Sequence, residues 1–277
     1  YYDKIRHRHS QVLAATGLTP AEFDALLITF KYHWDEYYSH FTLEGKVRQR
    51  ISYNSVVSDS GQNVLHIGIS EDQSLQELHA IQFEMTQPQA NRWIHLLSEI
   101  LRRTLKTLGE LPDRNSKRLI HILQGCEEVL LDGTERPVQR PLDEEGSLHA
   151  IVVKKTHSIK NNLLCTNNLR IVWLSSTYKG HVHDKKICDE EPLLLPKGIR
   201  LWQDTGFIGH KPDGVEICMP KKKPKGKELT CVEKQENKRI SGVRIKVEHA
   251  IGGMKKCRIV KERFRCHKFG FEDMVIL

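Results

Sequence analysis

Three acidic residues that lie far apart in the chain stand where they can act together. Asp132 ends the apolar run EEVLLD and Asp204 ends IRLWQD, so each closes a predicted strand and is followed closely by glycine. Glu248 lies in RIKVEHAIGG, within a predicted helix. Converging carboxylates repel one another, and their pKa values rise unless cations bind between them. The pattern therefore predicts a site for a hard divalent cation such as Mg²⁺, which prefers oxygen ligands.

The helix that carries Glu248 also carries cations suited to phosphate. Arg244, Glu248 and Lys255 share one flank with Ser241, beside an apolar stripe that predicts packing on a sheet. Two divalent ions about 3.5–4 Å apart can activate a nucleophile on one side of a phosphorus and stabilise the leaving oxygen on the other. Arg244 and Lys255 would then contact the phosphate oxygens. The apolar stripe consists of Ile240, Val243, Val247, Ile251 and Met254.

Asp184, in HVHD, competes with Asp204 for the second acidic role. We favour Asp204, and we expect Asp184 to cap or orient the helix that follows it. A single acid at a strand end is most often a turn or cap residue, so the prediction of a metal site depends on all three carboxylates.

The elements that must position these residues begin at about residue 126. Strand-like runs come first, and strands then alternate with helices, which predicts a mixed α/β sheet with flanking helices. TNN is a predicted hairpin turn, and RPVQRPLDEEG is a predicted surface connection. Thr230 and Glu233 form a capping box that opens the helix of Glu248. The strand-like runs are EEVLLDGTE, LHAIVVKK, SIKNNLLC, LRIVWLSS, GIRLWQD and VEICMP, and HVHDKKICDEE is a predicted helix.

Residues 1–112 are predicted to be mainly helical. Capping boxes begin helices at Thr19, Ser74 and Thr86, and the tight turn FEM separates the last two. This is the pattern of a helix-turn-helix at about 74–105, although an ordinary helical hairpin fits equally well. The second helix would present side chains that can read base edges near its N-terminus, namely Gln87, Gln89, Asn91 and Arg92. Residues 52–73 have no clean period and are predicted to be irregular.

Composition favours a globular protein with a polyanionic partner. The 277 residues are 39% hydrophobic and 28% charged, with a net charge of +8. Seven scattered cysteines without a CxxC indicate reduced thiols and a cytoplasmic protein. No apolar run is long enough to span a membrane, so no membrane partner is expected. The basic run KKKPKGK is typical of a solvated loop and would also suit DNA phosphates.

Several blocks in fixed order resemble the DDE transposases of bacterial insertion sequences, in the Harbinger-like group. The blocks are LLDGTERPVQRP, KKTHSIKNNLLCTNN, GHVHDKKI, LWQDTGFIGH, RIKVEHAIGGMKKCRIVKERFRC and, in the helical region, MTQPQANRWIHLL. The resemblance implies a ribonuclease H-like catalytic domain at 126–277 that follows an all-α DNA-binding region. Asp132, Asp204 and Glu248 would be the catalytic and metal-binding triad for two Mg²⁺ ions, with Mn²⁺ as a substitute. The implied substrates are double-stranded terminal inverted repeats and target DNA, bound by a homodimer in a nucleoid-associated synaptic complex.

The resemblance also has departures. The superfamily carries a Tyr-x2-Arg-x3-Glu-x6-Lys signature, which Arg244, Glu248 and Lys255 match, whereas Ser241 stands where tyrosine is usual. Segments 52–73 and 145–153 also differ from the family pattern. These departures favour the alternative function, a catalytically inactive, transposase-derived DNA-binding protein.

Overall fold

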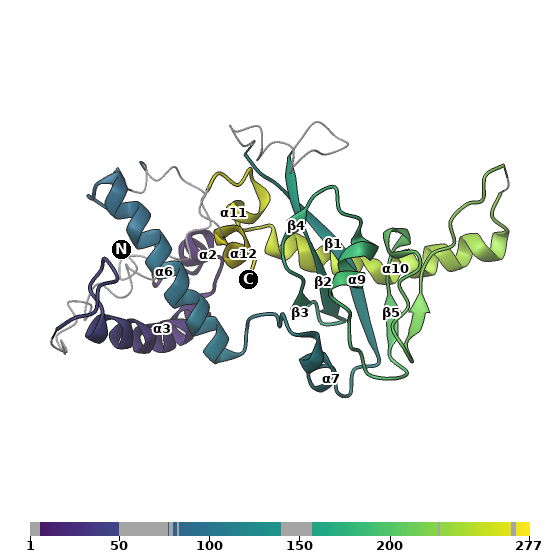
Figure 1. The fold of residues 1–277 in the computed structure, drawn as a ribbon, viewed down its shortest axis with the longest axis horizontal. Helices are drawn as coiled ribbons and strands as arrows, with labels where there is room; N and C mark the ends of the chain where they lie inside the picture. Colours follow the sequence, from purple (N-terminus) through teal and green to yellow (C-terminus); the bar gives the residue numbers. More distant parts are fainter. Residues whose placement is uncertain are drawn as a thin grey trace. The chain divides into compact units, whose positions relative to one another are not determined.

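The computed structural model describes residues 6–49, 77, 80–81, 83–139, 157–226, 228–266 and 270–277, which Figure 1 shows in colour. The chain divides into two compact units. The first is Tyr1–Leu111 with Lys256–Ile259 and Met274–Leu277, and the second is Pro112–Lys255 with Val260–Asp273. We describe each unit by itself.

Among the described residues of the first unit, the long helices and the helix before them are α2 (His9–Thr16), α3 (Pro20–His40) and α6 (Gln87–Leu108). The capping boxes that open α3 and α6 are confirmed. Thr19 N donates to Glu22 Oε2 at 2.8 Å, and Thr86 N donates to Gln89 Oε1 at 2.9 Å. The core of this unit consists of Val12 from α2, Phe23, Leu26, Phe30 and Trp34 from α3, and Leu97 and Ile100 from α6. None of the described helices is by itself long and apolar enough to cross a membrane, and only α2 and α3 taken as a pair, bent by 54°, meet that test.

The predicted helix-turn-helix falls partly outside the described residues. The turn FEM is confirmed, with Glu84 at φ 52°. Of the helix expected before it, only Glu77, Ala80 and Ile81 are described, all as helical. The predicted irregular segment 52–73 lies outside the described residues, as do the predicted strand 148–155 and the departure at 145–153. The helix-turn-helix therefore stays a prediction.

The second unit contains a mixed sheet, as predicted. In the described part of the chain the sheet has six strands in the order β3-β2-β1-β5-β6, with β4 also paired to β2. The β1–β2 and β2–β3 pairs are antiparallel, whereas β1–β5 and β5–β6 are parallel. The strands are β1 (Glu128–Pro137), β2 (Ser158–Thr166), β3 (Ile171–Leu174), β4 (Tyr178–Lys179), β5 (Arg200–Trp202) and β6 (Glu216–Cys218).

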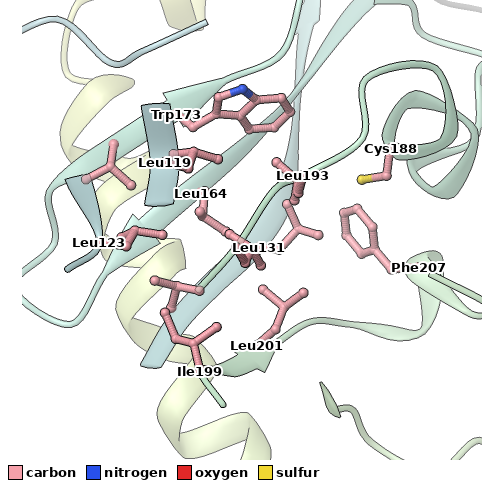
Figure 2. Packing of buried hydrophobic residues seen from close by; sticks show 13 residues of the cluster. Leu119, Leu123, Leu131, Leu164, Trp173, Cys188, Leu193, Ile199, Leu201 and Phe207 are labelled. Carbon is pink, nitrogen blue, oxygen red and sulfur yellow. The ribbon is translucent and has the colours of Figure 1, made fainter. Parts of the chain in front are cut away.

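One face of the sheet carries the main apolar core. Val129 and Leu131 alternate along β1 and point to this face, where they pack with Leu164, Trp173 and Leu201. Figure 2 shows the cluster closed by Leu119 and Leu123 and by Cys188 and Phe207. The covering elements are α7 (Leu119–Ile122), which directly follows the short helix η1 (Ser116–Arg118), together with α9 (Asp184–Glu190) and η2 (Thr205–Phe207).

Helix α10 (Cys231–Met254) packs against β1 and β5. Its predicted capping box is confirmed, because Thr230 N donates to Glu233 Oε2 at 2.9 Å and Glu233 N donates to Thr230 Oγ1 at 3.2 Å. Ile240 and Val247 of the predicted apolar stripe are buried. The helix ends at Met254, and two short helices follow, α11 (Arg258–Lys261) and α12 (Phe271–Ile276).

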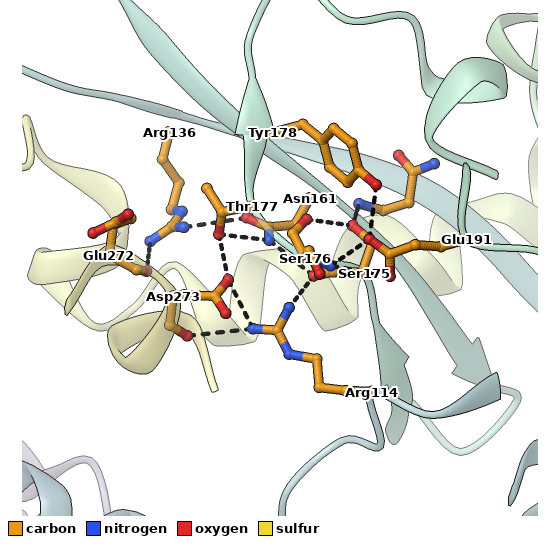
Figure 3. Close-up of polar contacts among 11 residues, drawn as sticks. Arg114, Arg136, Asn161, Ser175, Ser176, Thr177, Tyr178, Glu191, Glu272 and Asp273 are labelled. Atoms are coloured by element: carbon orange, nitrogen blue, oxygen red, sulfur yellow. Dashed lines mark hydrogen bonds and ion pairs between the residues drawn. The ribbon is translucent and has the colours of Figure 1, made fainter. Parts of the chain in front are cut away.

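The start of α12 is bound to the sheet by a polar network (Figure 3). Arg136 Nη1 donates to the carbonyl of Glu272 at 3.0 Å, and Arg136 Nη2 donates to Asn161 Oδ1 at 3.1 Å. Asp273 accepts from Thr177 Oγ1 at 2.6 Å and pairs with Arg114 at 3.0 Å. Arg136 is 1% exposed, and burial lowers its pKa to about 10. The prediction of a surface connection from residue 136 is therefore wrong at its start, because Arg136 and Pro137 belong to β1.

Candidate active site

The sheet register brings Asp132 and Asp204 to the same level. The parallel pairing of β1 with β5 ends at Leu130 and Trp202, and each aspartate stands two residues beyond this last pair. Asp204 follows β5, as predicted, and its Oδ1 accepts from Gly206 N at 2.7 Å. The prediction that Asp132 also ends a strand is wrong. Strand β1 continues to Pro137, because its antiparallel pairing with β2 continues after its parallel pairing with β5 has stopped.

Helix α10 places the guanidinium of Arg244 at both aspartates. Its Nη2 lies 3.4 Å from Asp132 Oδ2 and 3.9 Å from Asp204 Oδ2. The side chains of Arg244 and Asp132 are 15% and 17% exposed, so the pair is shielded from much of the solvent. Burial raises the pKa of Asp132, and repulsion from Asp204 and Asp184 adds to the rise. The hydrogen bond from Gly133 N and the charge of Arg244 oppose this shift without cancelling it.

Asp184 lies next to the same two strand segments. It is the first residue of α9 rather than its cap, because His183 occupies the cap position and the Asp184 carboxylate instead pairs with Lys160 Nζ at 3.1 Å. Of the two expectations for Asp184, capping of the helix is wrong and orientation of the helix is confirmed, because the ion pair ties α9 to β2. Asn162 strengthens this link by donating to the Asp184 carbonyl at 2.8 Å.

The glycines that follow the two aspartates make room for Asp184. A Cβ on Gly133 would lie 2.7 Å from Asp184 Oδ1, closer than real Cβ atoms approach. A Cβ on Gly206 would lie 3.0 Å from Asp184 Oδ2 and 2.9 Å from Asp204 Oδ1. These glycines therefore permit a close approach of side chain to backbone, which explains why glycine stands one position after Asp132 and two positions after Asp204.

Glu248 lies on α10 one turn beyond Arg244, on the flank that the sequence predicts. Its side chain is exposed and forms no hydrogen bond or ion pair with any described residue. Within the described ranges, no three His, Cys, Asp or Glu side chains are already grouped to hold a metal ion. The role of Glu248 as third ligand is therefore still a prediction. Lys255 caps the end of α10, and its Nζ donates to the carbonyl of Glu135 at 3.2 Å, where burial lowers its pKa.

The donor chemistry nevertheless fits a hard divalent cation. Asp132 is a largely buried carboxylate beside two further carboxylates, and this surrounding disfavours its charged form. A cation held by Asp132 and Asp204 would offset that repulsion, and carboxylate oxygens are the ligands that Mg²⁺ and Mn²⁺ prefer.

The predicted base-reading residues lie in the first turns of α6. Gln89 accepts from both the N and the Oγ1 of Thr86 at 2.9 Å, so its side chain is engaged in capping the helix. Arg92 is exposed, and its Nε donates to the carbonyl of Pro88 at 3.3 Å. Gln87 and Asn91 are half-buried. A role in DNA contacts stays a prediction for these four residues.

The contacts of Lys160 and Asn162 with Asp184 were not predicted from the sequence. Both residues alternate with Leu164 along β2, so they project to the buried face of the sheet. Polar side chains at core-facing positions of an apolar strand were the signal available for finding them.

Comparison with known proteins shows which family contains the residues of the candidate site. The family described as "DDE superfamily endonuclease" matches residues 131–276. The chain belongs to this family. Asp132, Asp184, Asp204 and Glu248 all lie within the matched segment, and the mixed sheet with flanking helices is consistent with the nuclease fold expected for the family.

A curated protein is also similar to the chain, the "Probable transposase for insertion sequence element IS702" from Microchaete diplosiphon. It is 26% identical over 150 residues, which cover 53% of this chain and 54% of that protein. The chain therefore spans about half the length of this curated relative. No solved structure matches the chain.

Proposed function

We propose that the protein is a transposase that performs metal-dependent cleavage and strand transfer on double-stranded DNA at the ends of an insertion sequence. The observation that carries this proposal is the common level of Asp132 and Asp204 beyond the last β1–β5 pair, with Arg244 beside both. Membership of the endonuclease family and the similarity to a probable transposase support the same reaction class.

Asp132, Asp204 and Glu248 would hold two divalent cations, Mg²⁺ or its substitute Mn²⁺. When bound, these ions supply an activated water or 3′-hydroxyl and stabilise the leaving oxygen of the phosphodiester. Glu248 would approach the two aspartates from α10, because it shares a flank with Arg244 and one turn separates the two side chains. Ribonuclease H-like topology is part of this proposal, and the antiparallel β3-β2-β1 and parallel β1-β5-β6 pairings support it.

The cations of α10 would bind and orient the DNA backbone. Arg244 would exchange its contacts with the two carboxylates for a phosphate oxygen of the substrate, since a guanidinium binds either kind of oxyanion. Lys255, fixed at the C-terminal end of the same helix, would hold a second phosphate. The half-buried setting strengthens both contacts, because charges attract more strongly where water is partly excluded.

The helical region would recognise the terminal repeats. Gln87, Asn91 and Arg92 stand near the start of α6, where a recognition helix places its base-reading residues. Gln89 would contribute mainly by capping that helix. A homodimer would bring the two ends of the element together.

A DNA-binding protein without catalysis is the second candidate. The exposed side chain of Glu248 and the serine at position 241 favour it, because both depart from a preassembled DDE site.

A nicking assay on DNA that carries the ends of the element separates the two candidates. The wild-type chain should cleave with Mg²⁺, and Asp132→Asn should abolish cleavage while DNA binding is retained. Asp213→Asn is the matched control, because Asp213 is exposed and precedes β6, at the end of the parallel strands away from Asp204. Cleavage that survives in Asp132→Asn refutes the catalytic assignment, and wild-type binding without cleavage supports the second candidate.

A further inference from the structure

A lysine-rich segment leaves the sheet at the same edge as the candidate active site. We call residues 219–230, between β6 and α10, the lysine arm. Cys218, the last residue of β6, pairs with Trp202 of β5, so the arm begins at the level of Asp204. In Figure 1 it extends past the sheet beside the first turns of α10.

Side chains of α10 hold the start of the arm in place. Lys221 N donates to Asn237 Oδ1 at 2.8 Å, and Asn237 Nδ2 donates to the carbonyl of Lys221 at 2.9 Å. The ammonium of Lys221 also pairs with Glu233 at 3.2 Å. These reciprocal bonds fix a loop that would otherwise be a solvated basic run.

The arm and the first turns of α10 together carry an excess of positive charge that their acids do not neutralise. Residues 219–239 contain eight Lys or Arg and three Glu, a net charge of +5 against +8 for the whole chain. Each of these glutamates is already paired, Glu228 with Lys223 and Lys234, Glu233 with Lys221, and Glu236 with Arg239. Lys222 and Lys225 are exposed and form no ion pair with any residue that the structure describes.

The distance from the anchored start of the arm to Arg244 follows from the geometry of α10. Asn237 and Glu233, which hold the arm, precede Arg244 by seven and eleven residues. At 1.5 Å per residue these steps correspond to about 10 and 16 Å along the helix axis. Successive phosphates on one DNA strand are about 3.4 Å apart along the duplex axis, so for a duplex that lies along α10 the interval equals about three to five base pairs.

We infer that the lysine arm binds the phosphate backbone of duplex DNA about three to five base pairs from the bond that the active site cuts. The inference rests on the proposed function for the position of that bond. The arm would extend the footprint of the catalytic unit on the DNA without taking part in the chemistry. It would contribute affinity that is independent of sequence, because phosphates carry no sequence information.

The salt dependence of DNA affinity tests this inference. Anisotropy measures binding of the full chain to a labelled random duplex of about 30 base pairs between about 50 and 200 mM salt. Each phosphate contact contributes about 0.9 to the slope of log affinity against log salt, so Lys222→Gln with Lys225→Gln should reduce the slope by about 1.8. Lys197→Gln, an exposed lysine that precedes β5 at the opposite end of that strand, should leave the slope unchanged.

Cleavage at saturating DNA keeps this test separate from that of the proposed function. The double lysine variant should cleave at the wild-type rate once DNA is saturating, because its defect lies in affinity. A slope equal to that of the wild-type chain overturns the arm as a phosphate-binding surface, whatever the nicking assay shows. A reduced slope in a chain that does not cleave supports the arm while the catalytic proposal fails.

Discussion

Alanine at position 133 should destabilise the second unit, because the added methyl would collide with Asp184. The Cβ would lie 2.7 Å from Oδ1 and 3.2 Å from Cγ of Asp184. Asp184 has little freedom to retreat, since it opens α9 and pairs with Lys160, and both side chains are mostly buried. Overpacking of this kind costs about 1–3 kcal/mol, which lowers the melting temperature of a unit of this size by about 3–9 °C.

A double-mutant cycle isolates the collision. Asp184→Ala alone removes the ion pair with Lys160, whose ammonium keeps its bond to the carbonyl of Val182 at 3.2 Å. In the Asp184→Ala background, Gly133→Ala should cost little, so the cycle should give a coupling energy of about 1–3 kcal/mol. Urea unfolding of the four proteins measures it.

Gly242→Ala is the matched control, because the new Cβ would meet nothing within 4 Å in the middle of α10. It should raise the free energy of unfolding by about 0.5–1 kcal/mol, as alanine does in place of glycine in a helix. A Gly133→Ala protein as stable as the wild type, or additive effects in the cycle, would refute the claim that a side chain at position 133 collides with Asp184.

Two further predictions concern buried polar groups. Arg136→Met should lower the free energy of unfolding by about 2–4 kcal/mol in a urea titration, since it leaves the Glu272 carbonyl and Asn161 Oδ1 without their donor. Arg118→Met is the control and should cost less than about 1 kcal/mol, because the Arg118 side chain is 69% exposed. Burial lowers the pKa of His210, so near this pKa the folded state binds fewer protons than the unfolded state. The contribution of neutral His210 to the free energy of unfolding is therefore fully present above about pH 6.5 and should decline as the pH falls below that value. His210→Gln should flatten this decline in melting temperatures measured from pH 7 to 5, and an unchanged decline would contradict the assignment.

Local sequence signals predicted the elements well where they depend on neighbouring residues. The capping boxes at Thr19, Thr86 and Thr230 begin three long helices where expected, because a cap needs only residues three positions apart. The TNN turn between β2 and β3 and the short helix that begins at the end of HVHD were also predicted, because both depend on residues close together in the chain.

Features set by distant partners could not be predicted from local patterns. The length of β1 depends on β2, whose antiparallel pairing carries the strand through Asp132 to Pro137. The burial of Arg136 depends on acceptors in β2 and α12, which lie 25 and 136 positions along the chain. Asp184 reaches the candidate site only because glycine occupies positions 133 and 206, and no spacing along the chain shows that contact.

The positions of some candidate residues were predicted from the sequence, whereas their catalytic roles stay predictions. Asp132 and Asp204 lie at one level beside Arg244. The sequence indicated this because each acid follows an apolar strand segment and helical spacing sets the flank of Arg244. The direction of the Glu248 side chain does not follow from periodicity, since helical spacing fixes the Cβ and leaves the rotamer open.

Comparison of Glu248→Gln with Asp184→Asn in the Mg²⁺-dependent nicking assay identifies the third carboxylate of the active site. If Asp132, Asp204 and Glu248 form the catalytic triad, Glu248→Gln should abolish cleavage while DNA binding is retained, and Asp184→Asn should only slow it by loosening α9. Cleavage at the wild-type rate by Glu248→Gln, or complete loss of cleavage in Asp184→Asn alone, would show that Glu248 is not the third acid of the triad.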